Sequence, residues 1–425
     1  MRRKLPRWLT YLLSAGLALL VVTRPAIPQA ISAPSSEIRG VWLTNVASGV
    51  LFLPQGVSRA VNQLAQLNFN TLYPVVWNRG YTTYPSSVTQ VATGETQLPL
   101  LHSTRIGRSL LATFIQQGHQ RNLRVIPWFE YGFMAPRRSS LVKRHPEWLT
   151  QYRDGSQVLK AGTAELGLPD TPETLWQSRR SRLRQLVRQQ SSHQLVWLNP
   201  LHPQVQEFLL DLILEVVTRY DVDGIQLDDH FSLPVELGYD PFTAQLYRQE
   251  HQGNSPPDDP LDEEWMRWRA NKLGDFMRRI FLAVKIAKPN CLISLSPNSP
   301  GFAYRHYLQD WQTWVRQGWL GEVIVQTYRN DLDRFVAELE QPAMREMHQL
   351  VPMGIGILTG TWNNPIAIAQ IQQQVEAVRD LGFDGISFFY WESLWGYITP
   401  EPPRERRKGF QSLFLPTAQV ESYKS

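Results

Sequence analysis

The stretch "RYDVDGIQLDDHF" (residues 219–231) decides how the whole chain is interpreted. A helical pattern ends at Arg219, and Asp-Val-Asp-Gly then turns the chain into a short apolar run. An apolar run of this length, bounded by turn residues, is typical of a buried strand. The run ends, however, in Asp228, Asp229 and His230. The sequence therefore predicts a fold in which a buried strand ends at a polar site.

The same order of helix, turn and strand returns along the chain, in "LNFNTLY", "RNLRVIPW" and "LGFDGISF". We expect Asp223 and Asp384, which lie in such turns, to cap or stabilise the turn rather than to take part in chemistry. The predicted strands are 38–46, 71–78, 124–131, 223–229, 291–297, 322–328, 353–358 and 385–391. The predicted helices are 58–67, 109–121, 172–190, 203–219, 263–287, 304–317, 331–348 and 366–381.

Alternation of strands and helices favours a parallel sheet with the helices outside it. Eight such units over roughly 380 residues fit a (β/α)8 TIM barrel with long βα loops better than an open, doubly wound sheet. No Gly-x-Gly-x-x-Gly follows the first strand, which counts against a dinucleotide-binding domain. In such a barrel, catalytic residues lie at the carboxyl ends of the strands. The pair Asp228–Asp229 is therefore expected where the loops meet over a cleft.

The first 30 residues have the pattern of an export signal: basic "MRRK", the apolar run "WLTYLLSAGLALLVV" and small residues near Ala30. The alternative is an uncleaved segment that anchors the protein to a membrane. We expect an exported protein, periplasmic or extracellular, whose barrel occupies residues 37–400. Residues 401–425, which include "PEPPRERRKGF", are expected to form a solvated tail.

Charge and cysteine content exclude several classes of protein. The chain has 43 basic and 38 acidic residues, and five of the basic ones lie in the first 30 residues. The remainder is balanced, so no nucleic acid is expected as a partner. Cys291 is the single cysteine, which rules out an internal disulfide or a cysteine-based zinc site. We expect no cofactor and no metal, and the oligomeric state stays open.

Polar and aromatic residues collect at the carboxyl ends of the other predicted strands. They are Trp42, Asn45, Trp77, Asn78, Trp128, Glu130, Ser296, Asn298, Gln326, Tyr328, Tyr390, Trp391 and Glu392. Aromatic rings stack on the apolar faces of sugar rings, and carboxylates and amides bind sugar hydroxyls. This set predicts a sugar-binding site, although each of the three tryptophans near the ends of the first three strands could instead belong to the core.

Cleavage of a glycosidic bond typically needs two carboxyl groups. Asp228 or Asp229 can supply one and Glu392 the other, with Glu130 in reserve. Neighbouring strand residues point to opposite sides, so we favour Asp228 as the reacting group and expect Asp229 to orient it or a loop. His230 is expected to form hydrogen bonds or pack. Glu392 could alternatively be an acid that only stabilises the first turn of a helix.

Several segments together resemble the glycosyl hydrolase-like 10 family of exported barrel proteins, most of all its cyanobacterial members. They are "EIRGVWLTNV" (37–46), "HPEWL" (145–149), residues 197–231, "ISLSP" (293–297) and "VIVQTYRND" (323–331). The resemblance covers residues 37 to 400. It implies a TIM barrel with glycoside hydrolase activity and, for a bacterial member, peptidoglycan glycan strands as substrate.

The resemblance also implies roles for particular residues. It makes the aspartate pair 228–229 the catalytic centre, and it matches family positions at Arg39, Trp42, Gln326, Tyr328 and Glu392. The sequence departs from the family at two positions beside the proposed cleft. His230 stands where tyrosine is usual, and Glu130 stands where asparagine is common. These departures suggest a substrate different from that of better-known members.

Two other functions stay open. A metal-dependent polysaccharide deacetylase is suggested by two aspartates beside a histidine, but no two histidines of the chain lie three or four residues apart, as such sites usually require. A barrel that binds glycans without cleaving them would use the same groove. The insertion at residues 232–262 is expected to be a surface loop that could close over the cleft.

Overall fold

A computed structural model of the chain describes residues 37–45, 48–53, 55–104, 109–160, 194–361, 364–395 and 399–414. The expected export signal (1–30) and the expected helix at 172–190 lie outside the described residues. The described residues belong to one compact unit. Within the described ranges, none of the helices combines the length and the apolar character that crossing a membrane requires.

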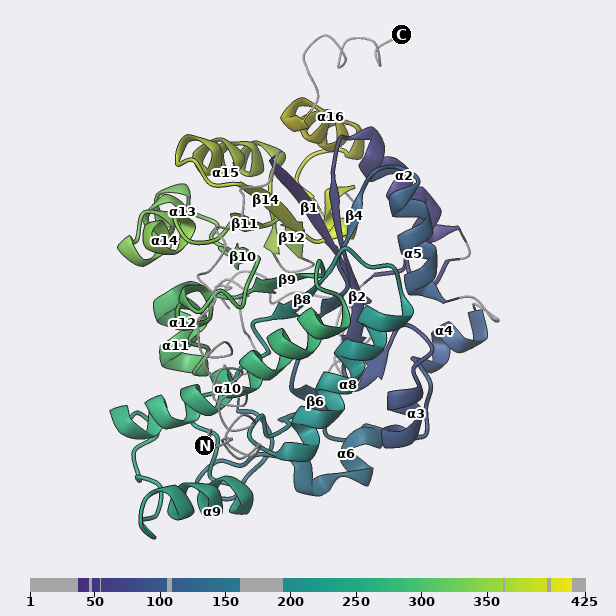
Figure 1. Cartoon of the computed structure of the whole chain (residues 1–425). Coiled ribbons are helices and arrows are strands. Elements are labelled where there is room, and N and C mark those ends of the chain that lie inside the picture. The colour runs from purple at the N-terminus through teal and green to yellow at the C-terminus, as the bar shows by residue number, and fades with distance from the viewer. Residues whose placement is uncertain are drawn as a thin grey trace, which may run out of the picture. The chain divides into compact units, whose positions relative to one another are not determined.

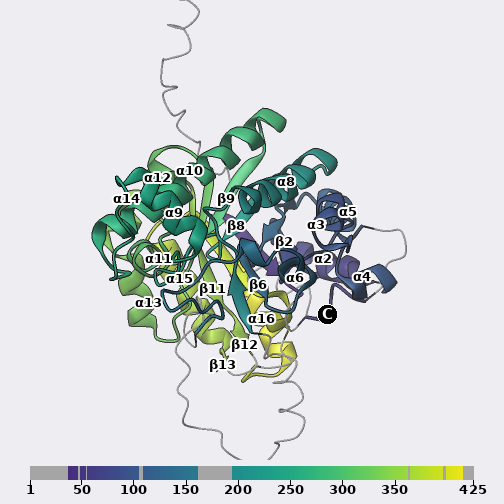
Figure 2. The same ribbon diagram turned by 90° about the horizontal axis from the view of Figure 1, so that it is seen from below.

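Eight parallel strands form a closed barrel, which confirms the predicted fold. They are β1 (Ile38–Leu43), β2 (Thr71–Asn78), β5 (Trp128–Phe129), β8 (Gly224–Asp228), β9 (Leu292–Ser296), β10 (Glu322–Gln326), β11 (Met353–Leu358) and β14 (Gly385–Phe389). Each strand pairs with the next one along the chain, and β1 pairs with both β2 and β14 to close the ring. In two views at right angles the strands lie in the middle and the helices lie around them (Figure 1; Figure 2).

The helices that surround the barrel are α2 (Gly56–Gln66), α5 (Leu110–His119), α8 (Pro203–Arg219), α10 (Glu263–Ala287), α11 (Pro300–Tyr307), α12 (Trp311–Arg316), α13 (Leu332–Leu339), α14 (Pro342–His348) and α15 (Ile368–Asp380). Each predicted helix at 304–317 and 331–348 is in fact a pair of helices. The first pair is divided at Leu308, whose φ of 51° is left-handed. The second is divided before Pro342, which has no N–H for helical bonding.

Proline also divides the third strand. The predicted strand at 124–131 is two short pieces, β4 (Arg124–Val125) and β5, both of which pair with β2. Pro127 lies between the pieces and cannot donate to the neighbouring strand. The loops contain further short elements: β3 (Tyr81–Thr82), α3 (Ser87–Thr93), α4 (Pro99–Thr104), β6 (Met134–Pro136), α6 (Ser140–Arg144), η1 (Pro146–Trp148), β7 (Leu195–Trp197), β12 (Gly360–Thr361), β13 (Asn364–Pro365) and η2 (Trp391–Leu394).

The insertion at 232–262 is not the surface loop that the sequence predicted. It contains helix α9 (Pro241–Glu250), and its first part buries Leu233, Val235 and Leu237. Backbone N–H groups of Leu233 and Val235 donate to carbonyl groups at the end of α11. The prediction missed this because the apolar residues alternate over too few positions to be told from a loop.

The expected solvated tail is also wrong for residues 403–414, which form helix α16 (Pro403–Phe414). Arg406, Phe410 and Phe414 are buried against the rest of the unit. The Arg406 guanidinium donates to the carbonyl oxygens of Thr359 at 2.5 Å, Ile366 at 2.7 Å and Ser393 at 2.9 Å. A sequence rich in proline and charge therefore contributes one of the most buried cations of the described chain.

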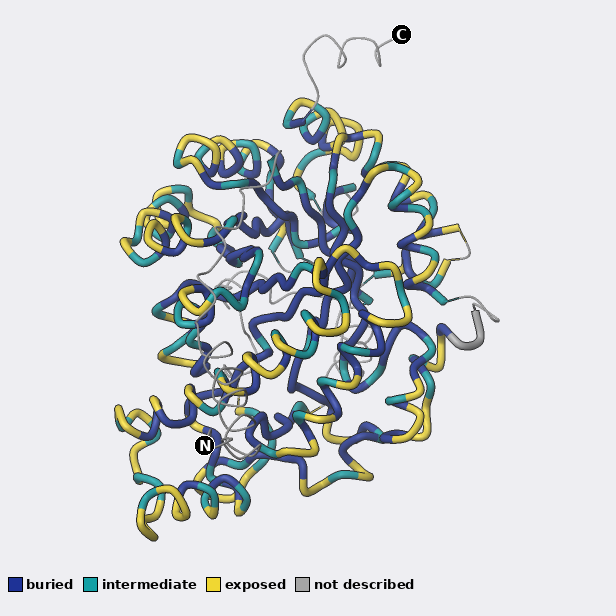
Figure 3. Tube along the Cα trace, viewed as in Figure 1, coloured by how far each residue is buried: buried dark blue, intermediate teal, exposed yellow. Residues whose placement is uncertain are grey.

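The interior of the barrel is partly polar. The Trp42 indole donates to Gln226 at 2.7 Å, and the Gln226 amide donates to Ser294 at 3.0 Å. Ser294 donates to buried Glu322, which also accepts from Arg124 at 2.9 Å. The burial of both faces of the strands is visible in the Cα trace, where exposed residues lie mainly on the outer helices and loops (Figure 3). Side chains at alternate strand positions therefore face the barrel interior. Gln226 of β8 points inward, so residues two positions away on that strand also point inward.

Candidate active site

Strand β8 brings Asp228 to the carboxyl end of the barrel interior. Asp228 follows Gln226 by two positions and so points to the same side of the strand. Its Oδ1 atom accepts a hydrogen bond at 3.0 Å from Gln326 Nε2, at the end of β10. The Gln326 amide also donates to the carbonyl of Ser296 at 2.8 Å. Three neighbouring strands therefore hold the Asp228 carboxyl group in place.

Asp229 lies just beyond the strand. Its backbone N–H donates to Asp228 Oδ1 at 2.7 Å, and its Oδ2 accepts from Asn298 Nδ2 at 3.0 Å. Because β8 ends at Asp228, Asp229 lies outside the strand, and its side chain does not have to point away from that of Asp228. Both carboxyl groups are buried and both approach the same atom, His230 Nδ1, at 3.1 Å from Asp228 and 3.0 Å from Asp229. The structure thus brings together the two aspartates that the sequence expected to point apart.

The His230 ring is fixed by aromatic neighbours. It stacks on Tyr131 with ring centres 5.2 Å apart and an interplanar angle of 2°, and Trp197 lies 6.1 Å away. The Tyr131 hydroxyl in turn accepts a hydrogen bond from Arg79 at 3.2 Å. Ring stacking leaves the imidazole little freedom to turn, so its Nδ1 atom stays between the two carboxyl groups.

The three groups have pKa values pushed in different directions. Burial and the adjacent charge of Asp229 raise the pKa of Asp228 well above its usual range. Burial also acts to raise the pKa of Asp229, but the His230 charge and hydrogen bonds outweigh it and the pKa is lowered. For His230, burial acts to lower the pKa, and the two carboxylates outweigh it and raise it well above its usual value. Near neutral pH the arrangement favours a protonated Asp228, an ionised Asp229 and an imidazolium.

Glu130 is the next carboxyl group in the interior. It follows β5, is buried, and accepts hydrogen bonds from Thr44 Oγ1 at 2.9 and 2.7 Å and from the amide of Asn78. Burial raises its pKa to about 7, against the hydrogen bonds and the nearby charges of Arg79 and His230. Glu130 therefore lies within electrostatic range of His230.

Glu392 lies in η2, after β14, and is buried. Its Oε1 atom accepts from the hydroxyl of Ser48, the backbone N–H groups of Gly49 and Val50 face the carboxyl group, and its buried Oε2 atom has no hydrogen-bond partner among the described residues. Burial outweighs these bonds and raises its pKa to about 8. In the part of the chain that the structure describes, the contacts of Glu392 go to the loop after β1 and not to the aspartate pair.

Tyr328 follows β10 and is buried beside Phe389, with ring centres 5.6 Å apart. Its pKa is raised well above the usual value by burial first and then by the charges of Asp228 and Asp229. The hydroxyl therefore keeps its proton and lies within electrostatic range of both carboxyl groups. With Gln326, it places the predicted Gln-x-Tyr pair at the site.

Three predicted binding tryptophans belong to the core. Trp42, Trp77 and Trp128 are 1%, 0% and 3% exposed, so none offers a free ring face. The Trp42 ring lies 6.1 Å from that of Trp128 inside the barrel. The Trp77 indole donates to the carbonyl of Gly132 at 2.9 Å, and its ring packs on Phe208 of α8. Their large apolar surface explains their burial better than sugar binding does.

The remaining predicted residues divide between the two ends of the barrel. Arg39 lies at the start of β1, near Asn68, Asn70 and Glu37, at the end opposite the aspartates. Trp391 is partly exposed after β14, and Asn45 follows β1. The Trp391 indole nitrogen and Asn45 Oδ1 are buried atoms that have no hydrogen-bond partner among the described residues. These two residues remain candidates for sugar binding, whereas Arg39 does not reach the site.

Sequence reasoning missed Thr44, Arg79, Tyr131 and Trp197 as parts of the site. Thr44 and Tyr131 follow strands one and three and could have been found by extending the strand-end rule by one residue. Trp197 lies on β7, which pairs with β6 in a two-stranded antiparallel sheet whose strands are too short to be predicted from periodicity.

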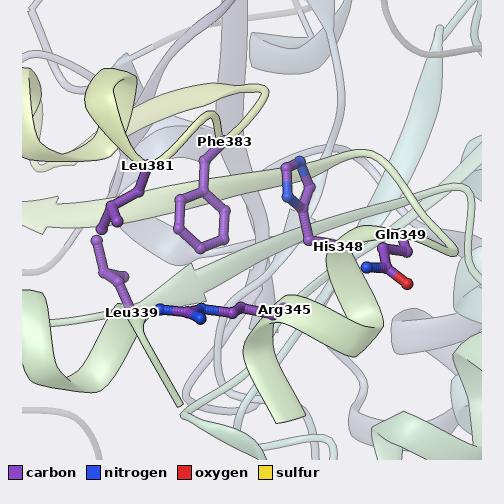
Figure 4. A pocket seen from close by; sticks show the side chains of 6 residues that line it. All are labelled: Leu339, Arg345, His348, Gln349, Leu381 and Phe383. Carbon is purple, nitrogen blue, oxygen red and sulfur yellow. The ribbon is translucent and has the colours of Figure 1, made fainter. Parts of the chain in front are cut away.

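The structure also has a cavity of about 230 Å³ at the other end of the barrel (Figure 4). Its lining residues are Leu339, Arg345, His348, Gln349, Leu381 and Phe383. His348 and Phe383 precede β11 and β14, so the cavity opens at the amino ends of these strands. His348 is held by Asp384 at 3.1 Å. The cavity is separate from the carboxyl groups described above.

A closed parallel barrel with buried carboxyl groups at the carboxyl ends of its strands is an arrangement that glycoside hydrolases use. The chain belongs to the glycosyl hydrolase-like 10 family, whose sequence profile matches residues 37–173 and 167–378. The resemblance seen in the sequence is therefore confirmed.

Individual similar proteins agree with this family. DigH of Escherichia coli strain K12, described as a glycosyl hydrolase, is 24% identical over 347 residues, which cover 72% of this chain and 70% of DigH. The glycosyl hydrolase YngK of Bacillus subtilis strain 168 is 20% identical over 307 residues, which cover 68% of this chain and 49% of YngK. The glycoside hydrolase domain of PgaB (BpsB) from Bordetella bronchiseptica has the same fold, with a TM-score of 0.54 and 12% identity over 87% of this chain and all of that domain.

Proposed function

We propose that this protein is an exported glycoside hydrolase that cleaves glycosidic bonds in a bacterial polysaccharide, with peptidoglycan glycan strands as the first candidate substrate. The observation that carries the proposal is the approach of Asp228 and Asp229 to one nitrogen of His230 at 3.1 and 3.0 Å. The family and the barrel fold support a glycan-acting hydrolase.

In this proposal Asp228 is the general acid. The raised pKa of Asp228 keeps a proton on its carboxyl group near neutral pH. Gln326, at the end of β10, holds that carboxyl group through a hydrogen bond. Asp229 is the neighbouring anion, oriented by Asn298 and His230. Two adjacent carboxyl groups with opposite pKa shifts are able to donate a proton and to stabilise developing positive charge at the same time.

Glycan binding is assigned to residues around this centre. Trp391 and Asn45 lie at the ends of β14 and β1 and carry buried polar atoms with no partner in the described chain. Sugar hydroxyl groups could supply those partners. Glu392 follows Trp391 in the chain, and Glu130 lies within electrostatic range of His230.

Digestion of peptide-stripped peptidoglycan glycan strands tests the proposal. The purified protein and its Asp228→Asn variant are compared by mass spectrometry of the products. We expect shorter strands from the wild type and none from the variant. Binding of strands by both proteins without products would identify a barrel that only binds glycans, and cleavage by both would remove Asp228 from the mechanism.

A second candidate function is a metal-dependent deacetylase. One observation favours it: Asp228, Asp229 and His230 each offer a ligand atom, all within 4.8 Å of one another. The raised pKa of His230 favours a protonated ring, and a metal would have to displace that proton. Release of acetate that stops after chelation would establish this function, and cleavage that is unaffected by a chelator would exclude it.

A further inference from the structure

We propose that the nucleophile of this site is supplied by the substrate: the carbonyl oxygen of a 2-acetamido group attacks the anomeric carbon of its own sugar. The inference rests on the proposed hydrolase function and names its substrate class, glycans of N-acetylated hexosamines. It follows from where the carboxyl groups lie relative to one another.

Asp228 and Asp229 both face one ring nitrogen of His230, so we infer that they act from one side of a sugar. In enzymes with two catalytic carboxyl groups, the groups flank the bond at about 5 Å or at 6.5–9.5 Å. Here Asp228 Oδ2 and Asp229 Oδ1 both approach His230 Nδ1, at 3.1 and 3.0 Å. A substrate therefore meets both carboxyl groups on the same side. Asp228 can protonate the leaving oxygen, but Asp229 is not placed to attack from behind.

The two buried glutamates are poorly suited to replace it. Both oxygens of Glu130 accept from Thr44, and one also accepts from Asn78. Oε1 of Glu392 accepts from Ser48, and none of the hydrogen bonds of Glu392 within the described chain reaches the aspartate pair. Burial raises their pKa values to about 7 and about 8, so a large fraction of each is neutral near pH 7. A neutral carboxyl group is a weak nucleophile and a weak base.

The polar groups that remain match an acetamido group. Its N–H needs an acceptor, and Asp229 is an ionised carboxylate held by Asn298 at 3.0 Å. Its carbonyl oxygen needs a donor, and Tyr328 supplies one. The Tyr328 side chain is buried and lies within electrostatic range of both aspartates. None of the residues that the structure describes forms a hydrogen bond with the Tyr328 hydroxyl, so the proton is available to a ligand.

The reaction balances without any further reagent. The acetamido oxygen forms a bond to the anomeric carbon, and the glycosidic carbon–oxygen bond breaks. The leaving oxygen keeps the bonding electrons and takes the proton of Asp228, while Asp229 accepts a hydrogen bond from the positively charged ring nitrogen of the cyclised sugar. Water then attacks the anomeric carbon, its proton returns to Asp228, and the ring opens to restore the acetamido group. The anomeric configuration is retained overall.

Three chemically matched glycan strands test the inference: fully N-acetylated, N-trifluoroacetylated and N-deacetylated. We expect the wild type to cleave the N-acetylated strand with retention, followed by NMR of the first products. The trifluoroacetylated strand should react at least about 100-fold more slowly, because fluorine withdraws electrons from the attacking oxygen, and the deacetylated strand should not react. Equal rates on the three strands, or inversion, would overturn the inference and leave the hydrolase function standing.

Binding of a stable cyclic analogue, the 2-methylthiazoline of N-acetylglucosamine, gives a second measurement that does not need turnover. Calorimetry should show binding to the wild type, at least tenfold weaker binding to Asp229→Asn, and unchanged binding to Glu236→Gln. Glu236 is a matched control because it is an exposed carboxylate on the segment that follows the pair. Absence of binding to the wild type would overturn the inference. If, in addition, none of the three strands is cleaved, the proposed function fails with it.

Discussion

His230 Nδ1 lies 3.1 Å from Oδ2 of Asp228, two residues earlier in the chain. The contact is possible because strand β8 ends at Asp228 and the chain turns at once. The same nitrogen contacts Asp229, so one imidazolium lies between the ionised Asp229 and the protonated Asp228. An unpaired charge buried in the barrel would destabilise the fold. The ionised Asp229 and the His230 imidazolium offset this cost by pairing with each other.

Replacement of Asp228 by asparagine should abolish glycan cleavage without unfolding the protein. Removal of a general acid lowers the rate by about 10²–10⁴-fold. The amide keeps the shape and the neutral charge of the protonated side chain, so the melting temperature near pH 7 should stay the same. Asp221→Asn, in an exposed turn at the other end of β8, is the matched control and should keep full activity. A variant that loses activity only because it has unfolded would contradict this prediction.

Replacement of His230 by glutamine should move the pH profile of cleavage. The positive charge of His230 opposes burial and keeps the pKa of Asp229 low. Without that charge the pKa of Asp229 rises, so the low-pH limb of kcat/KM should shift to higher pH. His119→Gln, at the amino end of the barrel beside Asp223, should leave the profile unchanged. An unshifted acid limb would show that Asp229 does not control it.

Glu130 should make the protein less stable as the pH rises. Its pKa is raised from 4.5 to about 7, so the folded state holds this proton to higher pH than the unfolded chain. The free energy of unfolding should therefore fall between those values, by on the order of 3 kcal/mol. Chemical denaturation from pH 4.5 to 8 should show a shallower decline for Glu130→Gln. Exposed Glu207→Gln should decline as the wild type does.

Arg406→Met should destabilise the protein strongly. The variant leaves the carbonyl groups of Thr359, Ile366 and Ser393 without their shared donor, at a cost of about 3 kcal/mol or more. Urea denaturation measures the loss, and Arg407→Met on the exposed side of α16 is the control. Equal midpoints for the two variants would mean that α16 contributes little to the fold.

Substitution of two tryptophans should separate binding from stability. Trp391→Ala removes a partly exposed ring that follows β14, so under the proposed role in glycan binding it should raise KM about tenfold at nearly constant stability. Trp77→Ala empties a fully buried position and should lower the free energy of unfolding by about 3–5 kcal/mol. Thermal melting and glycan titration of both variants check the contrast. Similar melting temperatures would place Trp77 outside the core.

Most of the barrel could be predicted because its signals are local. Each strand is a short apolar run behind a turn, and the eight runs lie where the strands form. The errors have equally local causes. Proline divides elements that the pattern joins, as at Pro127 and Pro342, and the charged segment before Phe414 hides a helix whose buried face is narrow.

The candidate site was predicted less evenly. The strand-end rule found Asp228, Gln326 and Tyr328 because parallel strands end at one face of a barrel. It could not tell which tryptophans point into that face, because Trp42 and Trp128 fill the interior while Trp77 turns to α8. The rule also could not show which of Glu392 and Glu130 interacts with the aspartate site, because the neighbours of both glutamates come from loops that are distant in the sequence.

The sequence by itself determined the order of strands and helices and the position of the aspartate pair at the end of strand β8. Both depend on hydrophobic periodicity and on turn residues within a few positions of each other. Only the tertiary structure decided that Asp228 and Asp229 share His230, that Glu130 joins them electrostatically and that Arg406 is buried. Those contacts depend on closure of the barrel and on the course of the chain beyond each strand. Burial then sets the protonation states, a property that no short stretch of sequence contains.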